Sequence, residues 1–265
     1  MPELPEIETI KKYLKKLVKG RKILNLEIFN RKSFQGTKNK IQGTKILRLK
    51  RQGKMLIFVL DNNYYLIFHL KMTGQIIFSK EKNINKTTRA VFFLDNGYLI
   101  FNDLRKFGWI KIVDDENLKK EIAKLGIDAL DLTFNDLKEI FKKTKRPIKL
   151  VLMDQKKIAG IGNIYANEAL FLAKIHPQQP ANKISNKKII NLLKSIKFVL
   201  KKAIQNEGTS FSSFIKPDMT PGHYQNQFFV YQRQGEKCLF CHSQIKKIIL
   251  SGRSTFFCPN CQVKK

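Results

Sequence analysis

A chain of 265 residues can form one large domain or two to three smaller ones, and 43% hydrophobic residues are enough for buried cores. The formal net charge of +30, from 51 basic and 21 acidic residues, creates self-repulsion that favours a polyanionic partner. No apolar run is long enough for a spanning helix, and the N-terminus lacks the layout of a signal peptide. We therefore expect a cytoplasmic protein that binds nucleic acid rather than a membrane surface.

The chain opens with Met-Pro-Glu-Leu-Pro-Glu, ahead of a helix predicted over residues 5–19. Removal of Met1, which the small second residue favours, would leave the secondary amine of Pro2, and such an amine can attack a sugar C1′. Glu3 and Glu6 place carboxylates close to that nitrogen. The same residues also suit a simple helix start, with proline at the first position and acids in the first turn. The hexapeptide alone leaves both interpretations open.

Residues 21–113 are predicted to be rich in short strands, among them 55–60, 64–70, 90–94 and 98–101. A tight turn at residues 95–97 joins the last two strands. Several short strands with turn signals between them indicate a β-sandwich or a barrel.

Three loops of this region carry candidate functional side chains. Lys54 follows Arg-Gln-Gly between two strands and suits a phosphate anchor, a catalytic ammonium or a solvated strand end. The other two loops, at residues 69–74 and 103–108, each end in glycine after a strand. Their Met72 and Phe107 would be assigned to the core on pattern alone, although apolar wedges between bases are a known use of such residues.

From about residue 115 the pattern becomes helical, with helices predicted over residues 117–125, 134–143, 164–173 and 186–206. Gly160-Ile161-Gly162-Asn163 forms a tight turn between two apolar segments. That layout is found in helix-turn-helix-like DNA-binding modules. On pattern alone, however, an ordinary helical hairpin is the better interpretation. Residues 217–226 are rich in Pro, Gly, Asn and Gln and are predicted to be a linker.

The four cysteines predict a metal site. Cys238 and Cys241 are separated by sixteen residues from Cys258 and Cys261, a C-x₂-C-x₁₆-C-x₂-C spacing that indicates one structural Zn²⁺ in a closed tetrahedral site. Two disulfides are a weaker alternative in a cytosolic protein, and His242 could compete as a ligand. Between the two cysteine pairs, residues 246–257 are predicted to form a β-hairpin with Arg253 near its tip. Arg253 could contact a phosphate there, or it could be a solvated turn residue.

These motifs, taken in order, resemble the bacterial formamidopyrimidine-DNA glycosylase family of oxidised-purine repair enzymes. The resemblance covers the whole chain. It rests on Pro-Glu-Leu-Pro-Glu at the start, Arg-Gln-Gly-Lys, His-Leu-x-Met-x-Gly, Asn-Asp-x-Arg-x-Phe-Gly, Asp154-Gln155 leading to residues 159–165, and the four-cysteine finger with Gly-Arg-Ser-Thr-Phe at residues 252–256. One such motif could arise by chance, but their collinear set hardly can.

The resemblance implies an α+β fold with a β-sandwich and its leading helix in residues 1–130, a helix-two-turn-helix domain in 131–222 and a zinc finger in 223–265, with DNA across the cleft between domains. It implies a monomeric, nucleoid-associated glycosylase and apurinic/apyrimidinic lyase acting on damaged double-stranded DNA by a Schiff base and β,δ-elimination. The implied catalytic residues are Pro2 as nucleophile, Glu3 as general acid/base, and Lys54 and Arg253 as phosphate clamps. The implied DNA-contacting residues are Glu6, His69, Met72, Arg105, Phe107, Lys149 and Asn163.

Some positions depart from the family pattern. Leu104 and Lys106 replace a common proline and a common arginine, and no Lys or Arg stands near Ser212, where one is expected beside the lesion-recognition loop. Leu4 favours the oxidised-purine branch over the endonuclease VIII-like branch, which usually begins Pro-Glu-Gly-Pro-Glu. Two rivals remain: that oxidised-pyrimidine glycosylase, and a zinc-finger DNA-binding protein without catalysis.

Overall fold

The structure is a computed structural model, and it describes residues 1–210 and 214–264. Residues 211–213 lie outside the described residues. They include Ser212, near which the family pattern leads us to expect a Lys or Arg. The chain divides into two compact units. Unit 1 comprises Met1–Lys124 and Ile204–Gln225, and unit 2 comprises Leu125–Ala203 and Asn226–Lys265.

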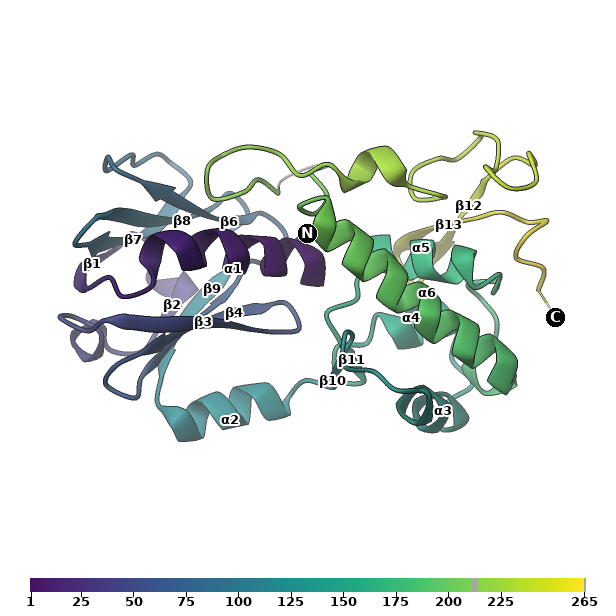
Figure 1. Ribbon diagram of the computed structural model, residues 1–265, viewed down its shortest axis with the longest axis horizontal. Coiled ribbons are helices and arrows are strands. Elements are labelled where there is room, and N and C mark those ends of the chain that lie inside the picture. The colour runs from purple at the N-terminus through teal and green to yellow at the C-terminus, as the bar shows by residue number, and fades with distance from the viewer. Residues whose placement is uncertain (211–213, 265) are drawn as a thin grey trace. The chain divides into compact units, whose positions relative to one another are not determined.

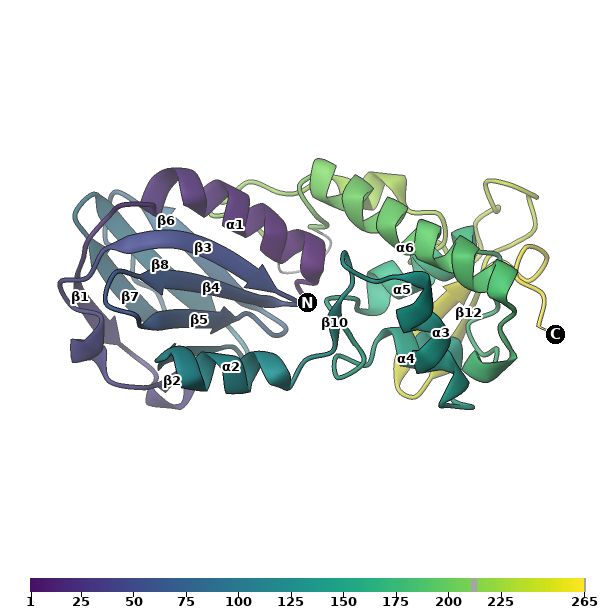
Figure 2. The same ribbon diagram turned by 60° about the horizontal axis from the view of Figure 1, so that its bottom comes forward.

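Unit 1 is built on two β-sheets, whose strands all fall within residues 23–113. The first sheet has the order β1 (Ile23–Ile28), β7 (Thr88–Leu94), β8 (Gly97–Asp103), β6 (Gly74–Ser79). The second has the order β2 (Phe34–Gln35), β9 (Trp109–Val113), β5 (Tyr65–His69), β4 (Met55–Leu60), β3 (Ile46–Gln52). Neighbouring strands are antiparallel except β2 and β9. Figure 2 shows the two sheets as stacked layers.

Helix α1 (Leu4–Val18) joins the core of both sheets. Ile7, Ile10, Leu14 and Val18 recur at helical spacing and are fully buried, so one stripe of the helix faces the core. They pack in one cluster with side chains of both sheets, such as Phe68 and Phe92. Figure 1 shows α1 lying lengthwise along the sandwich. The position of the first residues of the chain is therefore set by the end of the sandwich at which α1 begins. Short helices η1 (Arg31–Ser33) and η2 (Lys38–Lys40) and helix α2 (Asp115–Ala123) complete the unit up to residue 124.

Unit 2 is mainly helical up to residue 203. It contains α3 (Phe134–Lys142), α4 (Ile148–Leu152), α5 (Asn163–Leu172) and most of α6 (Asn186–Gln205), with a short parallel pair of β10 (Ile127–Asp128) and β11 (Ile158–Ala159). The 3₁₀ turn η3 (Ala181–Lys183) precedes α6. The 3₁₀ turn η4 (Tyr224–Gln227) precedes the zinc finger.

The C-terminal part of unit 2 is a β-hairpin of β12 (Lys246–Leu250) and β13 (Arg253–Phe257). Ser251 and Gly252 between the strands both have positive φ, 46° and 72°. A two-residue turn of this kind matches the right-handed twist of a hairpin. Phe171 of α5 packs with Val230, Ile245 and Phe256, so the finger shares a core with the helices.

The mixed fold predicted from the sequence is confirmed, and the predicted long elements lie within a few residues of the observed ones. The short elements α4, β10 and β11 were not predicted, because tertiary contacts rather than sequence periodicity define them. The expected linker at 217–226 is largely tied to unit 1, since Phe78 donates its N–H to the Pro217 carbonyl and Tyr224 is fully buried. Among the described residues, no helix has the length and apolarity needed to cross a membrane.

Candidate functional site

The first residues of the chain are buried where α1 begins. Pro2 is buried, and Glu3 is only 2% exposed. Glu3 is the N-cap of α1, and its backbone N–H donates to Oε2 of Glu6 at 2.7 Å in a capping-box arrangement. The helix-start interpretation of the hexapeptide therefore holds, and the same contacts fix the backbone of Glu3, the residue that follows Pro2.

Glu6 links the start of α1 to a distant part of unit 1. Its second oxygen, Oε1, accepts the backbone N–H of Thr209 at 2.9 Å. Gly208 has φ of +81°, and a Cβ at that position would lie 3.0 Å from the same oxygen, so the approach suits glycine. Because Glu6 is 1% exposed and both its oxygens accept backbone N–H groups, it acts as a fixed support.

The electrostatics at the chain end favour a neutral amine. Burial lowers the pKa of the Met1 α-ammonium, Glu3 and Glu6 oppose the shift, and Lys54 adds to it. This ammonium stands in for the amine that Pro2 would carry after Met1 is removed. Lys54 itself is 5% exposed and follows Gly53, whose φ is 54°, at the β3–β4 turn.

His69, at the end of β5, is held neutral. Burial, with Lys71 and Lys54 nearby, lowers its pKa to about 3. Its Nδ1 accepts the backbone N–H of Lys71 at 3.1 Å, and its ring packs against Trp109 at 5.4 Å. The imidazole therefore shapes the following loop, which carries Met72, and carries no charge near pH 7.

One buried carboxylate ties the two candidate wedge loops together. Asp103 is fully buried, and its carboxylate accepts from the hydroxyl of Thr73 in one loop and from the backbone N–H of Gly108 at 2.6 Å in the other. The N–H of Arg105 donates to the Thr73 hydroxyl at 3.0 Å. Sequence reasoning gave Asp103 no role, although an acid at the end of a strand and five residues before a glycine was the signal available.

These loops present apolar side chains to solvent. Phe107 is 54% exposed and Leu104 is 64% exposed, whereas Met72 is half-buried. The guanidinium of Arg105 lies 4.9 Å from the Phe107 ring centre, a cation–π contact that stabilises the ring beside it. The assignment of Phe107 to the core on pattern alone is wrong, because the loop around Asp103 turns the ring outward.

A second group of predicted residues meets at strand β13 in unit 2. Lys149 of α4 is fully buried, and its Nζ donates to the Ser254 carbonyl at 2.9 Å and to Oγ1 of Thr255 at 2.7 Å. Asn163, at the start of α5, donates to the same Ser254 carbonyl at 3.1 Å. Both side chains therefore fix the strand immediately after Arg253, which is exposed beside the hairpin tip.

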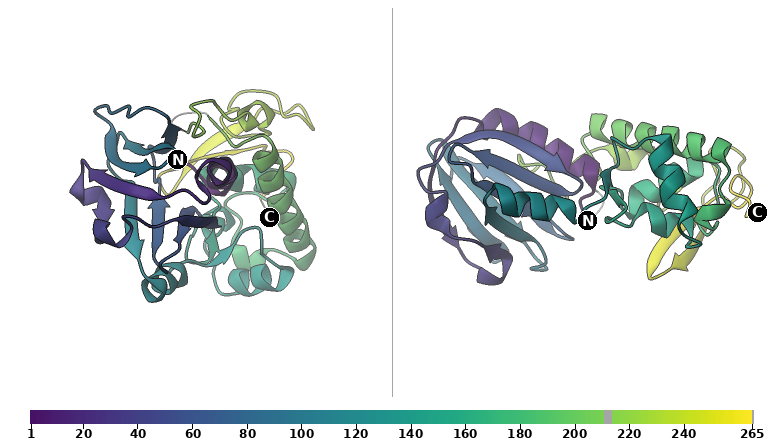
Figure 3. Two further views of the ribbon diagram at one scale, coloured as in Figure 1. Left: turned by 60° about the vertical axis from the view of Figure 1, so that its left-hand side comes forward. Right: turned by 90° about the horizontal axis from the view of Figure 1, so that it is seen from below.

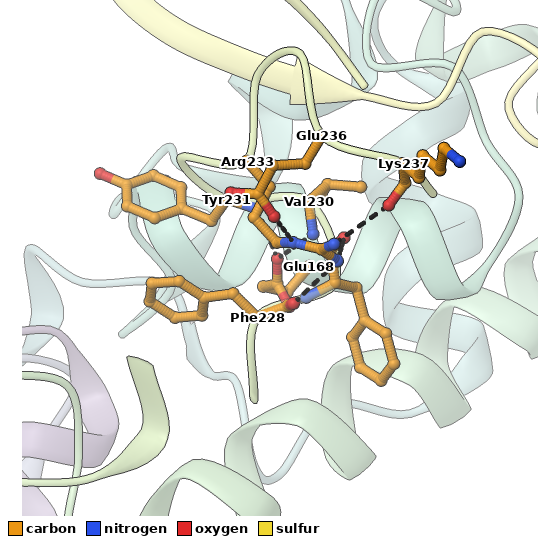
Figure 4. Close-up of polar contacts among 8 residues, drawn as sticks. Glu168, Phe228, Val230, Tyr231, Arg233, Glu236 and Lys237 are labelled. Carbon is orange, nitrogen blue, oxygen red and sulfur yellow. Dashed lines mark hydrogen bonds and ion pairs between the residues drawn. The ribbon is translucent and has the colours of Figure 1, made fainter. Parts of the chain in front are cut away.

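Two further residues of α5 hold the finger, and sequence reasoning missed both. The Asn167 side chain accepts the N–H of Phe256 at 2.9 Å and donates to the Asn163 carbonyl at 2.6 Å. The Glu168 carboxylate is fully buried and accepts the N–H groups of Phe229, Val230 and Tyr231 at 2.8 to 3.0 Å (Figure 4). Burial raises the pKa of Glu168, while these donors pull it down. An acid inside an apolar helix was the only sequence signal.

The four cysteines form the predicted zinc site. Their sulfur atoms all lie within 4.8 Å of one another, with separations of 3.4 to 3.9 Å for the closest pairs. Tetrahedral zinc with Zn–S bonds of about 2.3 Å places its sulfur atoms roughly 3.8 Å apart, so the residues fit the ion. His242 is exposed and is not in this cluster, and no disulfide joins the cysteines among the described residues.

Comparison with known proteins gives the same picture over the full length. Models of the formamidopyrimidine-DNA glycosylase N-terminal domain, its H2TH domain, and a zinc finger found in FPG and IleRS match residues 1–110, 125–214 and 235–263. A formamidopyrimidine-DNA glycosylase of Rickettsia africae is 43% identical and one of Solibacter usitatus 39% identical, each covering 99% of both chains. This chain belongs to the formamidopyrimidine-DNA glycosylase family.

Solved structures of the family share the fold. Lactococcus lactis Fpg in complex with DNA containing an abasic site superimposes with a TM-score of 0.92 and 34% identity, covering 99% of this chain and 100% of that one. The same protein in complex with DNA containing Fapy-dG gives the same values. The zinc finger assignment is thus confirmed by a family model as well as by geometry, and the predicted fold is confirmed by the solved structures that superimpose on this chain.

Proposed function

We propose that this protein is a bifunctional DNA glycosylase and apurinic/apyrimidinic lyase of base excision repair that removes oxidised purines. The observation that carries the proposal is the burial of Pro2 and Glu3 at the N-cap of α1, in a chain that matches the family from end to end. A prolyl nitrogen held there needs no cofactor to act as a nucleophile.

The chemistry follows from these groups. The neutral amine of Pro2 attacks C1′ of the damaged nucleotide and the N-glycosidic bond breaks. The base leaves with the bonding electrons and takes up the proton that the amine loses. Glu3 donates a proton to the ring oxygen as the sugar opens, which leaves an iminium between Pro2 and C1′. The iminium acidifies the C2′ proton, so its removal expels the 3′ phosphate, and a second elimination expels the 5′ phosphate. Lowering the amine pKa by burial and by Lys54 supplies the unprotonated nucleophile.

The DNA contacts are assigned by chemistry. C1′ is unreachable inside a stacked duplex, so the nucleotide must flip out at a cost of roughly a few kcal/mol. Exposed Phe107, held by Arg105, and half-buried Met72 supply the apolar surface that fills the gap. Lys54, Asn163 and Arg253 contact phosphates flanking the lesion. Since Lys149 is fully buried, we assign it to positioning β13 rather than to direct contact.

The substrate preference rests on two observations. Leu4 follows the oxidised-purine branch of the family, and Lactococcus lactis Fpg, a solved relative, was crystallised with Fapy-dG DNA. We therefore propose 8-oxoguanine and formamidopyrimidines as substrates, with a monomeric enzyme acting on nucleoid DNA in the cytoplasm. The alternative is the oxidised-pyrimidine specificity of the endonuclease VIII-like branch.

Borohydride trapping tests the chemistry. Protein of verified intact mass, with and without Met1, is incubated with duplexes containing 8-oxoguanine, Fapy-dG, an oxidised pyrimidine or an abasic site. The proposal predicts a covalent adduct only when Met1 is gone. The adduct should form faster on duplexes with oxidised purines than on the duplex with an oxidised pyrimidine. An adduct that persists with a blocked N-terminus and Pro2→Gly would contradict Pro2 as the nucleophile. Complete absence of an adduct, with intact DNA binding, would favour a non-catalytic zinc-finger protein.

A further inference from the structure

Helix α6 carries a strongly basic outer face. Within Asn186–Gln205 the sequence contains no aspartate or glutamate and has lysines at positions 187, 188, 194, 197, 201 and 202. The buried face of the helix, which includes Ile189, Leu192 and Ile196, packs into the protein, so the lysines gather on the other side. In contrast, Lys119 and Lys120 of α2 each pair with an acid one turn earlier.

Two large apolar side chains interrupt this basic face. Ile190 is 42% exposed and Phe198 is 51% exposed. They lie eight residues apart, about 12 Å along the helix, and on the same stripe as the exposed Lys187, Lys194 and Lys201. Scattered exposed apolar residues are ordinary, but an apolar pair at helical spacing between lysines makes an amphipathic stripe that the apolar face of a partner segment can cover.

A cavity adjoins the first half of this face. It has a volume of about 590 Å³ and lies where the end of α5 meets α6. Leu172 and Ala173 give it an apolar wall, and Lys174, Lys188 and Lys194 surround it, with no carboxylate among the described lining residues. A side chain inserted there would find apolar contact and positive potential together.

The face lies apart from the residues assigned to DNA in unit 2. Figure 3, in its right-hand view, shows α6 in green along one side of the unit and the yellow β12–β13 hairpin, which carries Arg253, on the opposite side. The positive charge of α6 is therefore not an extension of the phosphate contacts at β13.

We propose that the outer face of α6 is a docking surface for an acidic, amphipathic segment of a partner protein. Carboxylates of the segment pair with Lys187, Lys194 and Lys201, and its apolar residues cover Ile190 and Phe198. Single-stranded nucleic acid is the rival occupant, since it also binds lysines and aromatic rings. The structure favours the protein segment, because aliphatic Ile190 offers no stacking platform and the Lys202 ammonium lies 5.7 Å from the Phe198 ring centre, over the ring.

A fluorescence anisotropy titration tests the proposal with a defined probe. The probe is a labelled peptide of about 16 residues in which Leu and Phe recur every seven or eight positions among Asp and Glu, a spacing that follows one helix face. A scrambled peptide of the same composition and a labelled single-stranded oligonucleotide are titrated in parallel. The variants are Ile190→Ala with Phe198→Ala, Lys194→Glu with Lys201→Glu, and the charge-matched control Lys138→Glu with Lys142→Glu on α3.

The wild-type protein is expected to bind the patterned peptide more tightly than the scrambled one. Both α6 variants should weaken that binding at least about tenfold, and the α3 control less than about threefold. All variants should keep their circular dichroism spectrum and their cleavage of abasic-site DNA. No saturable peptide binding, or equal weakening by the α3 control, overturns the proposal. Loss of oligonucleotide binding in the α6 variants with unchanged peptide binding would assign the face to nucleic acid instead.

Discussion

The two groups of candidate site residues are built in different ways. Pro2, Glu3 and Glu6 lie within one turn of each other in sequence, and a local capping box places them. Lys149, Asn163 and Arg253 are separated by up to 104 residues, and they gather because side chains of α4 and α5 bind the backbone of β13. The first group depends on how one helix begins, whereas the second depends on the fold of a whole unit and on its metal.

The sharpest test of this difference is removal of a zinc ligand. Structural zinc contributes roughly 10 kcal/mol or more to the folding of small fingers. Cys241→Ser should therefore unfold the finger, release zinc and abolish binding to lesion DNA, while the sandwich of unit 1 stays folded. Zinc content by atomic absorption and DNA binding by gel shift measure the two losses. Normal DNA binding by zinc-free protein would contradict the dependence of the second group on the metal.

Glu3→Gln tests the local group. Loss of a general acid typically lowers the rate about 10² to 10⁴-fold. We expect a loss of that size in single-turnover excision of 8-oxoguanine, with little change in DNA affinity and with zinc retained. Trapping on a preformed abasic site should be less affected, because the base has already left. A parallel loss of affinity would mean that Glu3 is mainly a structural cap.

Glu168→Ala tests the support of the second group. The substitution leaves the N–H groups of Phe229, Val230 and Tyr231 without their acceptor in a buried site. Each unsatisfied donor costs about 1 to 3 kcal/mol, so we expect unit 2 to lose roughly 3 kcal/mol or more. Urea unfolding measures the loss, and Glu168→Gln, which keeps one oxygen acceptor, should recover part of it. A neutral result for Glu168→Ala would show that water replaces the carboxylate.

Acid should weaken unit 1 through His69. The folded state lowers its pKa to about 3, so the unfolded chain takes up the proton first. The contribution of His69 is complete above its ordinary pKa and is lost as the pH falls toward 3. Between about pH 7 and pH 5 the expected loss is roughly 2 kcal/mol. Urea unfolding at both pH values measures it, and His69→Gln should flatten the dependence. An unchanged slope in the variant would assign the acid sensitivity to other groups.

Arg253→Ala is expected to have the smallest effect. Loss of one phosphate contact should weaken binding to lesion DNA about tenfold and reduce the salt slope of the binding constant by about one. Zinc content and thermal stability should not change, because Arg253 is exposed and its strand is held by other side chains. The adjacent turn substitution Ser251→Ala is the matched control. Loss of zinc in Arg253→Ala would make the residue structural.

The sequence predicted the local features well and the long-range ones poorly. The Asp95–Gly97 turn, the helix start at Glu3 and the cysteine spacing are encoded by adjacent residues, and all three are observed. Asp103 and Glu168 were missed because each acts by accepting backbone N–H groups from other segments. A buried acceptor of this kind leaves no periodic pattern in the sequence. The exposure of Phe107 was missed for the same reason, since a contact to Asp103 sets the loop.

The bond between Glu6 and Thr209 also sets an order of events during synthesis. The two residues are 203 positions apart, and residues 204–225 return to unit 1 after most of unit 2 has been made. A growing chain therefore carries its N-terminal residues for most of translation without the second donor that fixes Glu6. Closing so long a loop is slow compared with forming the local cap. The start of α1 is thus made early in translation, and it is among the last parts of unit 1 to receive all of its contacts.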